Sequence, residues 1–476
     1  MPTLTDVPQK LIIGGDEHFS ADTSLLTVVY PGDHSVPVGE CHVLEMAQLD
    51  QVCHAAKSGF DAFRFSSVAC RVEILTQLSR LVEAHREKFA KLIVMEAGKP
   101  HKLAMAEIDR AVALFAGYAN WLNTVEHRKS YFMDGYQADV AYFPLGPVLA
   151  ITPYNLPLNL VVHKLAPAIA AGNSFTLKPA SKTPLTALHL GGLALEAGYD
   201  AMSVVPCGTE TAEALVTSDV FEKLSFTGSA EVGWRLRSIS GQKDVTLELG
   251  GNAACIVEDF PDQELEQVAQ RCAEGAFWYA GQICISVQRL FINKAVSERF
   301  YKAFIDAVRA LKVGDPKDPE TDIGPMISLD DVHRTRNLVN EAIHQGANAL
   351  YGGSTYNLFT MNPTVLNRTT PQMRVNTEEC FAPIVTYTEY DRFEDALAMA
   401  NDSAFGLQAG VFTQDKNKVE QAYQTLDVGG VVINDVPTLR LDGMPYGGVK
   451  ASGIGREGIL SGVAGVSNLK TLIQKA

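Results

Sequence analysis

Residues 147–178 read PVLAITPYNLPLNLVVHKLAPAIAAGNSFTLK, and this stretch decides the fold. Val148-Leu149-Ala150-Ile151 is a short apolar run typical of a buried strand, and residues 159–171 have the composition of a helix that ends at Gly172. A second apolar run follows at 174–177. A strand, a helix and a strand in this order predict a right-handed βαβ unit of a parallel sheet.

The same alternation continues on both sides of residue 250. Up to 250, it predicts strands at 203–205, 223–226 and 245–249, and helices at 185–197, 209–217 and 230–238. After 250, it predicts helices near 262–280, 296–311, 330–345, 393–401 and 416–426, with strands at 289–292, 384–389, 409–412 and 430–433. We therefore expect two α/β domains with parallel sheets, and ligands at the carboxyl ends of the strands.

Two segments stand outside this alternation. Residues 50–97 carry apolar side chains at helical spacing and are stopped by Gly98-Lys99-Pro100. Residues 122–143 alternate like a strand, and the tail 466–473 could add another. Extended segments of this kind commonly pair with a partner subunit, which predicts an oligomerisation arm. The alternative is an edge hairpin on its own domain.

Composition narrows the class of protein. The chain of 476 residues is long enough for two or three domains, and 46% hydrophobic with 20% charged residues is typical of a globular protein. A net charge of −15 argues against nucleic acid or an anionic membrane as partner. Eight scattered cysteines without CxxC spacing predict no metal site and suit the cytoplasm, and no signal peptide or membrane span is visible.

Three residues have the chemistry of covalent carbonyl catalysis. Cys284 in GQICIS is a candidate nucleophile, Glu248 in LELGG is a carboxylate at a strand end, and Asn155 in PYNLP offers an amide donor in a rigid loop. A lone cysteine is more often a core residue, and a carboxylate at a strand end can be a solvated surface group. Their combination favours a nucleophile, a base and an oxyanion donor.

Two segments of the alternating region are candidates for a dinucleotide site. Lys178 and Ser181 follow the strand 174–177 and place an ammonium and a hydroxyl at its carboxyl end. Phe226-Thr227-Gly228-Ser229 is a strand end, a tight turn and a helix N-terminus, which suits an anion.

Seven motifs in order resemble the aldehyde dehydrogenase superfamily over almost the whole chain: YNLP, GNSFTLKPAS, FTGSAEVG, LELGG, GQICIS, EECFAP and MPYGGVKASGIGREG. The resemblance implies an α/β subunit with two doubly wound domains and a β arm that makes homodimers or homotetramers. It places a Rossmann-like nicotinamide-binding domain at 1–121 and 144–247, a catalytic domain at 248–440, and the arm at 122–143 and 463–476. The pattern is most similar to lactaldehyde, non-phosphorylating glyceraldehyde-3-phosphate and succinate-semialdehyde dehydrogenases.

The resemblance also implies roles for single residues. Cys284 would attack the aldehyde, Asn155 and the Cys284 N–H would hold the oxyanion, and Glu248 would activate the water that hydrolyses the thioester. The cofactor-binding set would be Thr152, Pro153, Lys178, Ser181, Gly208, Phe226, Thr227, Gly228, Ser229, Leu249, Glu379 and Phe381. Ala382 stands where the family usually has glycine before Pro383.

One departure from the family bears on the cofactor. Where many NAD-using relatives carry a glutamate after Lys-Pro-Ala, this chain has Ser181. That glutamate would bind the ribose hydroxyls and repel a 2′-phosphate, whereas serine can donate to phosphate oxygens. We therefore expect NADP to be preferred and NAD to be accepted.

Another departure bears on the substrate. His163 falls where the family lines its entrance tunnel, and Arg440 falls in a loop that reads the far end of the substrate. Together they would favour a small aldehyde with an anionic or hydroxylated tail. The alternatives are that Arg440 pairs with Asp442 or Asp435, and that His163 is a satisfied core histidine.

Three other functions stay open at this point. A CoA-acylating semialdehyde dehydrogenase would pass the acyl group to CoA, although such relatives often lack the base carboxylate. A catalytically silent homologue would act as a binding protein, and a hydrolase would use Cys284 without a nicotinamide cofactor.

Overall fold

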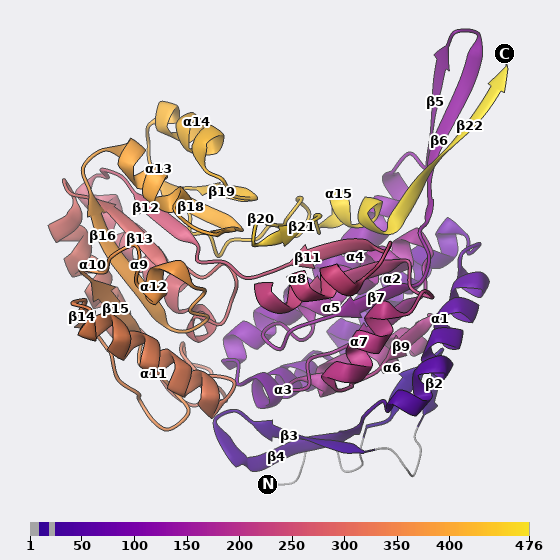
Figure 1. The fold of residues 1–476 in the computed structure, drawn as a ribbon, viewed down its shortest axis with the longest axis horizontal. Helices are drawn as coiled ribbons and strands as arrows, with labels where there is room; N and C mark the ends of the chain where they lie inside the picture. The colour runs from indigo at the N-terminus through magenta and orange to yellow at the C-terminus, as the bar shows by residue number, and fades with distance from the viewer. Residues whose placement is uncertain (1–8, 19–23, 476) are drawn as a thin grey trace.

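The computed structural model describes residues 9–18 and 24–475, without the side chains of 262 and 263. The parts of the predicted cofactor-binding segment at 1–8 and 19–23 lie outside the described residues. Figure 1 shows two α/β bodies, each built on one large sheet, with a long ribbon that projects from the first body. No helix in the described ranges has the length and apolar character needed to cross a membrane.

The first sheet confirms the parallel βαβ prediction. Its order is β2-β1-β9-β8-β7-β10-β11-β21, and the five strands from β9 to β11 run parallel. Ile151 pairs with Lys178 and Thr227 pairs with Glu248, so the carboxyl ends of these strands share one edge. The strands are β1 (Leu11–Ile13), β2 (Asp16–His18), β7 (Val148–Ile151), β8 (Phe175–Lys178), β9 (Met202–Val204), β10 (Lys223–Thr227), β11 (Asp244–Glu248) and β21 (Gly453–Ile454).

Eight helices pack around this sheet, and one contact fixes the loop that carries Asn155. The N-terminus of α5 leaves backbone N–H groups without helical partners, and buried Glu107 accepts those of Leu158 at 2.9 Å and Asn159 at 3.0 Å. The other end of α5 stops at Gly172, whose φ of 92° is left-handed. The helices are α1 (Leu49–Phe63), α2 (Val68–Ala84), α3 (Arg86–Ala97), α4 (His101–Thr124), α5 (Asn159–Ala171), α6 (Pro184–Glu196), α7 (Thr209–Thr217) and α8 (Ala230–Ile239).

The second sheet has the order β14-β15-β16-β13-β12-β18-β19 and contains all four predicted strands. The prediction did not include β12, which lies between β13 and β18, or β14 and β15 at one side of the sheet. The strands are β12 (Ala254–Val257), β13 (Arg289–Asn293), β14 (Asn348–Tyr351), β15 (Thr364–Asn367), β16 (Ile384–Tyr390), β18 (Gln408–Phe412) and β19 (Gly430–Ile433). The helices are α9 (Asp262–Phe277), α10 (Ser297–Ala310), α11 (Leu329–His344), α12 (Arg374–Thr377), α13 (Phe393–Asn401) and α14 (Lys416–Thr425).

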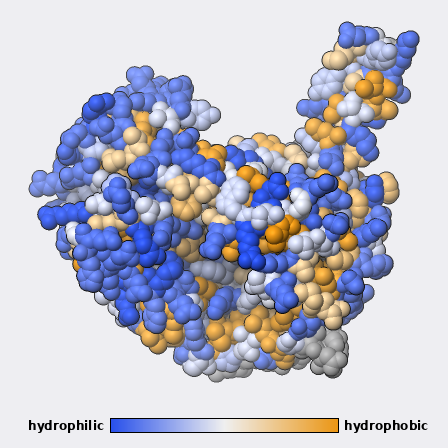
Figure 2. Space-filling model, viewed as in Figure 1, coloured by the Kyte–Doolittle hydropathy of each residue, from blue (hydrophilic) through white to orange (hydrophobic). Residues whose placement is uncertain are grey.

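The projecting ribbon is a separate three-stranded sheet of β5 (Arg128–Met133), β6 (Tyr136–Pro144) and β22 (Ser467–Lys475). Extended structure was expected from residue 122, but α4 continues to Thr124, because Leu122 is still buried in the apolar stripe of that helix. Beyond the first body, the ribbon exposes large apolar side chains, which include Phe132, Leu469 and Ile473, and Figure 2 shows apolar surface along it.

Two smaller pairs of strands complete the fold. The hairpin of β3 (Leu25–Tyr30) and β4 (Asp33–His42) reaches the second body, where the Tyr30 hydroxyl donates to Asp315 at 2.9 Å. β17 (Phe405–Gly406) pairs with β20 (Val449–Lys450). The chain then returns to the first sheet through β21 and α15 (Ile459–Gly462) before it enters the ribbon. This return brings residues 440–457 to the carboxyl edge of the first sheet.

Candidate active site

A cavity of about 500 Å³ takes its walls from both bodies. It brings together eleven of the residues predicted from the sequence: Pro153, Asn155, Thr227, Gly228, Ser229, Glu248, Leu249, Cys284, Glu379, Phe381 and Arg440. Six predicted residues are not part of its wall: Thr152, His163, Lys178, Ser181, Gly208 and Phe226. The three candidate catalytic groups therefore meet in one place, although they are far apart in the sequence.

A strained turn places Cys284 at the cavity wall. Tyr279, Ala280 and Gly281 have φ angles of 49°, 54° and 68°, so three consecutive residues adopt the left-handed conformation. A Cβ atom at Gly281 would lie 2.1 Å from the carbonyl oxygen of Ala382, so only glycine fits there. The chain changes direction after α9, and this turn places the thiol at the wall of the cavity.

Gln282 joins this turn to its surroundings, and the sequence analysis did not single it out. Its side-chain oxygen accepts from the Tyr154 hydroxyl at 3.3 Å and from the Ile327 N–H at 3.0 Å. Its backbone carbonyl accepts from Asn155 Nδ2 at 2.9 Å. The position of Gln282 inside the GQICIS motif was a signal that could have marked it.

Two N–H groups near the thiol remain available for an oxyanion. Asn155 uses one amide hydrogen for Gln282, and no acceptor for the other lies within the described part of the chain. The backbone N–H of Cys284 likewise donates to no described residue. Two fixed, unengaged donors beside a nucleophile are the arrangement that stabilises a developing oxyanion.

The Cys284 thiol is protonated in this environment. Burial raises its pKa to about 11, and the nearby carboxyls of Glu379 and Glu248 act in the same direction. A hydrogen-bonding contact of 3.5 Å with the Tyr446 hydroxyl and the charge of Arg440 act in the opposite direction. The thiol therefore needs a base before it can act as a nucleophile.

Glu248 is a buried carboxyl group in the wall of the same cavity. It is the last residue of β11, it is buried, and neither of its carboxyl oxygens has a hydrogen-bond partner among the residues described. Burial and the charge of Glu457 raise the pKa of Glu248 well above its usual value. A carboxyl with a raised pKa holds a proton more strongly than an ordinary one, which is a property of general bases.

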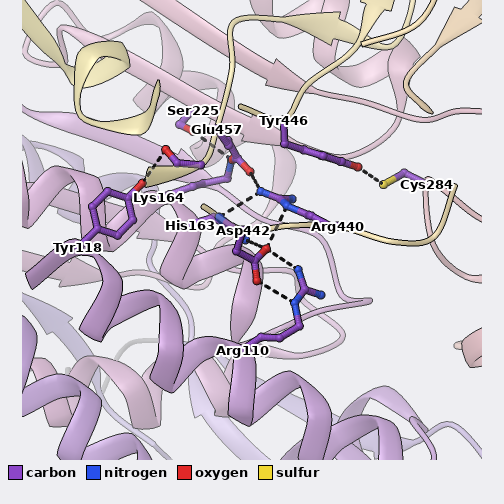
Figure 3. A network of polar contacts seen from close by, with 11 residues as sticks. Arg110, Tyr118, His163, Lys164, Ser225, Cys284, Arg440, Asp442, Tyr446 and Glu457 are labelled. Atoms are coloured by element: carbon purple, nitrogen blue, oxygen red, sulfur yellow. Dashed lines mark hydrogen bonds and ion pairs between the residues drawn. The ribbon is translucent and has the colours of Figure 1, made fainter. Parts of the chain in front are cut away.

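Arg440 lines the cavity and is held by a buried ionic network (Figure 3). Its Nη2 donates to Glu457 at 3.1 Å, and its Nε lies 3.3 Å from Asp442 Oδ1. The guanidinium also stacks 3.8 Å from the centre of the Tyr446 ring. Of the two pairings that the sequence left open, the one with Asp442 is present, whereas Asp435 pairs with Arg271 at 2.6 Å.

His163 lies behind Arg440, which corrects its predicted place at the cavity wall. Its side chain is fully buried, because α5 packs into the interior of the first body on every side. Nδ1 accepts from Arg440 at 3.1 Å, and Nε2 donates to Asp442 at 3.0 Å. Burial and the charge of Arg440 lower the pKa of His163 to about 4, so the imidazole is neutral. This histidine orients the two charged residues.

The network holds more positive than negative charge. Arg110 binds Asp442 through two hydrogen bonds of 2.7 and 2.9 Å, and Lys164 donates to Glu457 at 2.8 Å. Although burial alone would raise the pKa of Glu457, the charges of Lys164 and Arg440 lower it to about 2. With Arg440, three cations thus face two carboxylates, and His163 is neutral. Two of the three cations, Arg110 and Arg440, line the cavity.

The carboxyl edge of the first sheet has the groups that a nicotinamide dinucleotide needs. Lys178 ends β8, its ammonium group makes no hydrogen bond or ion pair with any described residue, and burial lowers its pKa. The Thr227 hydroxyl is buried without a partner, and Ser229 begins α8 without a side-chain cap. A cation, a hydroxyl and a helix N-terminus are a donor set for phosphate groups, so these residues fit such a cofactor.

The remaining predicted cofactor residues surround this edge. Glu379 accepts from the Gly251 N–H at 3.1 Å, and burial raises its pKa to about 7. Phe381 has a left-handed φ of 46° and makes an edge-to-face contact with Tyr154 at 6.0 Å. Ser181 is exposed in the loop after β8, and Gly208 precedes α7. Thr152 and Phe226 are buried at the ends of their strands.

Comparison with known proteins agrees with this architecture. Residues 19–472 match the model of the aldehyde dehydrogenase family. The 3-sulfolactaldehyde dehydrogenase of Priestia aryabhattai is 37% identical over 470 residues, which cover 96% of both chains. Aldehyde dehydrogenase 21 of Physcomitrella patens, solved with its reaction product succinate, superposes with a TM-score of 0.94 at 35% identity over 98% of this chain and 99% of that one. The glyceraldehyde-3-phosphate dehydrogenase GapN of Methanocaldococcus jannaschii, solved with NADP, superposes with a TM-score of 0.92. It is 31% identical over 96% of this chain and 100% of that one.

Two parallel-sheet bodies around a cavity with a thiol, a carboxyl and phosphate-binding groups define a nicotinamide-dependent oxidoreductase. The match over nearly the whole chain makes the assignment specific: this chain belongs to the aldehyde dehydrogenase family. It is an NAD(P)-dependent enzyme that oxidises aldehydes. The predicted fold class and family are both confirmed.

Proposed function

We propose that this enzyme oxidises a short aldehyde with an anionic or 2-hydroxy tail to the free carboxylic acid, with NADP preferred over NAD. The observation that carries the proposal is the convergence of Cys284, Glu248, Asn155 and Arg440 on one cavity. The first three supply the chemistry of aldehyde oxidation, and the fourth supplies a charge for the tail of the substrate.

In the first step, the carboxylate form of Glu248 takes the thiol proton of Cys284, and the sulfur bonds to the aldehyde carbon. The carbonyl oxygen becomes an oxyanion that accepts hydrogen bonds from Asn155 Nδ2 and from the Cys284 N–H. When bound, the nicotinamide accepts the hydride that leaves this carbon, so that a thioester remains on Cys284. Glu379 and Phe381, close to the same wall, would orient the cofactor ring.

Between the two steps, Glu248 releases the thiol proton to solvent and becomes a carboxylate again. In the second step, this carboxylate takes a proton from a water molecule whose oxygen bonds to the acyl carbon. The carbon–sulfur bond then breaks, and the acid product and the Cys284 thiolate are released. The unpartnered Glu248 carboxyl supports transfer to water, whereas a CoA-acylating enzyme has no use for this base. A requirement for CoA in turnover would favour that alternative, and turnover without a nicotinamide cofactor would favour a hydrolase.

The guanidinium groups of Arg110 and Arg440 at the cavity wall support an anionic tail. Two of the similar proteins act on or release compounds of this kind, a sulfonated lactaldehyde and succinate. Tyr446 connects Arg440 and Cys284, since its ring stacks on the guanidinium and its hydroxyl contacts the sulfur. The anionic group therefore lies only a few bonds from the reacting carbon, which favours a short aldehyde.

The Arg440→Ala variant is expected to raise KM for an anionic aldehyde about 30- to 100-fold and to change KM for a neutral aldehyde far less. The reason is the loss of a charge-assisted contact worth about 2–3 kcal/mol. Steady-state kinetics with succinate semialdehyde and propanal measure both values. Arg440→Lys is the matched control, since it keeps the charge and should raise KM for the anionic aldehyde less. Equal increases for both aldehydes would contradict an anion-binding role.

Two observations support NADP as the preferred cofactor. Ser181 and the adjacent Lys182 are exposed after β8, and Lys182 makes no ion pair within the described ranges. With Lys178, they place two unpaired cations and a hydroxyl where a 2′-phosphate could bind. The related GapN structure contains NADP.

The Ser181→Glu variant is expected to lower kcat/KM for NADP about 10- to 100-fold and to improve NAD relative to NADP. A carboxylate at this position repels the 2′-phosphate and can bind the ribose hydroxyls of NAD. Initial rates with each cofactor at saturating aldehyde give the ratio, and Ser181→Ala serves as the control for loss of the hydroxyl alone. A wild-type enzyme that used NAD ten times better than NADP would contradict the cofactor assignment.

The β5-β6-β22 ribbon supports assembly of two or four identical chains. Its outer strands have unpaired edges, and its exposed apolar side chains extend beyond the body of the subunit. We assign this ribbon as the oligomerisation arm, the first sheet with its helices as the cofactor-binding domain, and the second as the catalytic domain.

A further inference from the structure

Tyr446 contacts the sulfur of Cys284 although nothing in the proposed reaction so far uses it. The hydroxyl lies 3.5 Å from Sγ, and Figure 3 shows it directed at the thiol. The residue is 6% exposed, and Cys284 is the one hydrogen-bond partner of its hydroxyl within the described part of the chain. A buried phenol without another partner must satisfy its O–H group at this sulfur.

Two features hold Tyr446 in this position. Its backbone forms a reciprocal pair with Glu457, with N–H to oxygen distances of 3.0 and 2.7 Å. The Arg440 guanidinium covers its ring, and that guanidinium is itself fixed by Glu457, Asp442 and His163. The buried network therefore fixes the direction of the hydroxyl. The guanidinium against the ring also draws electron density from the ring, which makes the O–H group a better donor.

The phenol is the group that can donate in this contact once Cys284 has lost its proton. Burial and the neighbouring charges of Cys284 and Glu248 raise the pKa of Tyr446 well above 10, so it keeps its hydrogen throughout the working pH range. A thiol is a weak acceptor, but a thiolate is a strong one, so the contact strengthens when Cys284 loses its proton. Of the charged groups that face the sulfur, Glu379 and Glu248 disfavour the thiolate, and Arg440 favours it.

We propose that Tyr446 is a further catalytic residue, which donates its phenolic hydrogen to the Cys284 sulfur and stabilises the thiolate, with Arg440 as the positioning residue behind its ring. This inference deepens the proposed function, because it rests on Cys284 as the nucleophile. It assigns a second task to Arg440, which would bind the substrate and support the donor at the nucleophile.

Alkylation of Cys284 in the free enzyme tests this proposal without an aldehyde or a cofactor. Wild type and Tyr446→Phe are treated with iodoacetamide at pH 8.5, and mass spectrometry follows the peptide that contains Cys284, so the other cysteines do not interfere. Phenylalanine keeps the ring under Arg440 and removes only the hydroxyl. Loss of a charge-assisted hydrogen bond raises the thiol pKa by about one to two units. A more basic thiolate is also more nucleophilic, so the rate falls roughly three- to tenfold.

Tyr118→Phe is the matched control. It removes another buried hydroxyl beside the same network, which donates to the Gly458 carbonyl at 3.2 Å and does not touch the sulfur. Its alkylation rate should stay within about 1.5-fold of wild type. An unchanged or faster rate in Tyr446→Phe would overturn the proposal, and so would an equal loss in both variants, which indicates a general loosening. A Tyr446→Phe effect in an enzyme that oxidised no aldehyde would support the thiolate donor and contradict only the proposed reaction.

Discussion

Cys284→Ala is expected to abolish reduced-nicotinamide formation from every aldehyde, with a loss of about four orders of magnitude or more. Removal of a covalent nucleophile has effects of this size, because no other group can form the intermediate. Among the described residues that line the cavity, Cys284 is the one cysteine. The initial rate at saturating aldehyde and cofactor measures the loss.

A matched variant separates this effect from general damage. Cys70→Ala removes an exposed thiol on α2, outside the cavity, and should retain the wild-type rate. Thermal unfolding of Cys284→Ala should be close to that of wild type, since alanine fits in the space of a partly exposed thiol. A folded Cys284→Ala enzyme that kept more than a few per cent of the rate would contradict the covalent route.

Glu248→Gln is expected to lower kcat about 10²- to 10⁴-fold and to leave an acyl group on Cys284. Glutamine has nearly the same shape but cannot accept a proton, so the thiol must lose its proton to solvent. Once the thioester has formed, water attacks it slowly without a base, and this second loss makes the acyl group accumulate. Mass spectrometry of the variant after incubation with aldehyde and NADP should show the acyl mass on the Cys284 peptide. An acyl-free Cys284 together with a normal kcat would contradict the assignment of Glu248 as the base.

The raised pKa of Glu248 also fixes the direction of the pH dependence. Only its carboxylate form is a base, so kcat of the wild type should increase with pH through the raised pKa, and Glu248→Gln should lose this dependence. The free energy of unfolding changes with pH in the opposite direction. The unfolded carboxyl has a pKa of about 4.3, so the folded state binds more protons above that pH and loses stability as pH rises through the folded pKa. Glu248→Gln should therefore be at least as stable as wild type at pH 8.

Much of the fold could be predicted because local signals and tertiary structure agree. The helix at 159–171 and its end at Gly172 match α5, since the composition of a helix and a terminating glycine are both visible in the sequence. The strands β12, β14 and β15 were not predicted, although β12 is as short and as buried as β7, which was. At the junction with the ribbon, α4 continues past the predicted boundary at residue 122. Leu122 is buried there by packing that no local pattern in the sequence reveals.

The candidate site was likewise predicted only in part from the sequence. Cys284, Glu248 and Asn155 lie in motifs, and the structure brings them to one cavity. The position of His163 behind Arg440 could not be predicted from the sequence. It depends on contacts with the segment that contains Asp442 and Glu457, almost 300 residues later in the chain. Such long-range charge pairing leaves no spacing in the sequence.

The most direct test of the account is the initial rate of NADPH formation by the wild-type enzyme across matched small aldehydes: neutral, 2-hydroxy and anionic. We predict measurable turnover without CoA, with the highest kcat/KM for an anionic or 2-hydroxy aldehyde and a lower kcat/KM for the neutral one of equal length. The absence of turnover with every aldehyde, with NADP and with NAD, in a preparation whose Cys284 can still be alkylated, would contradict the account.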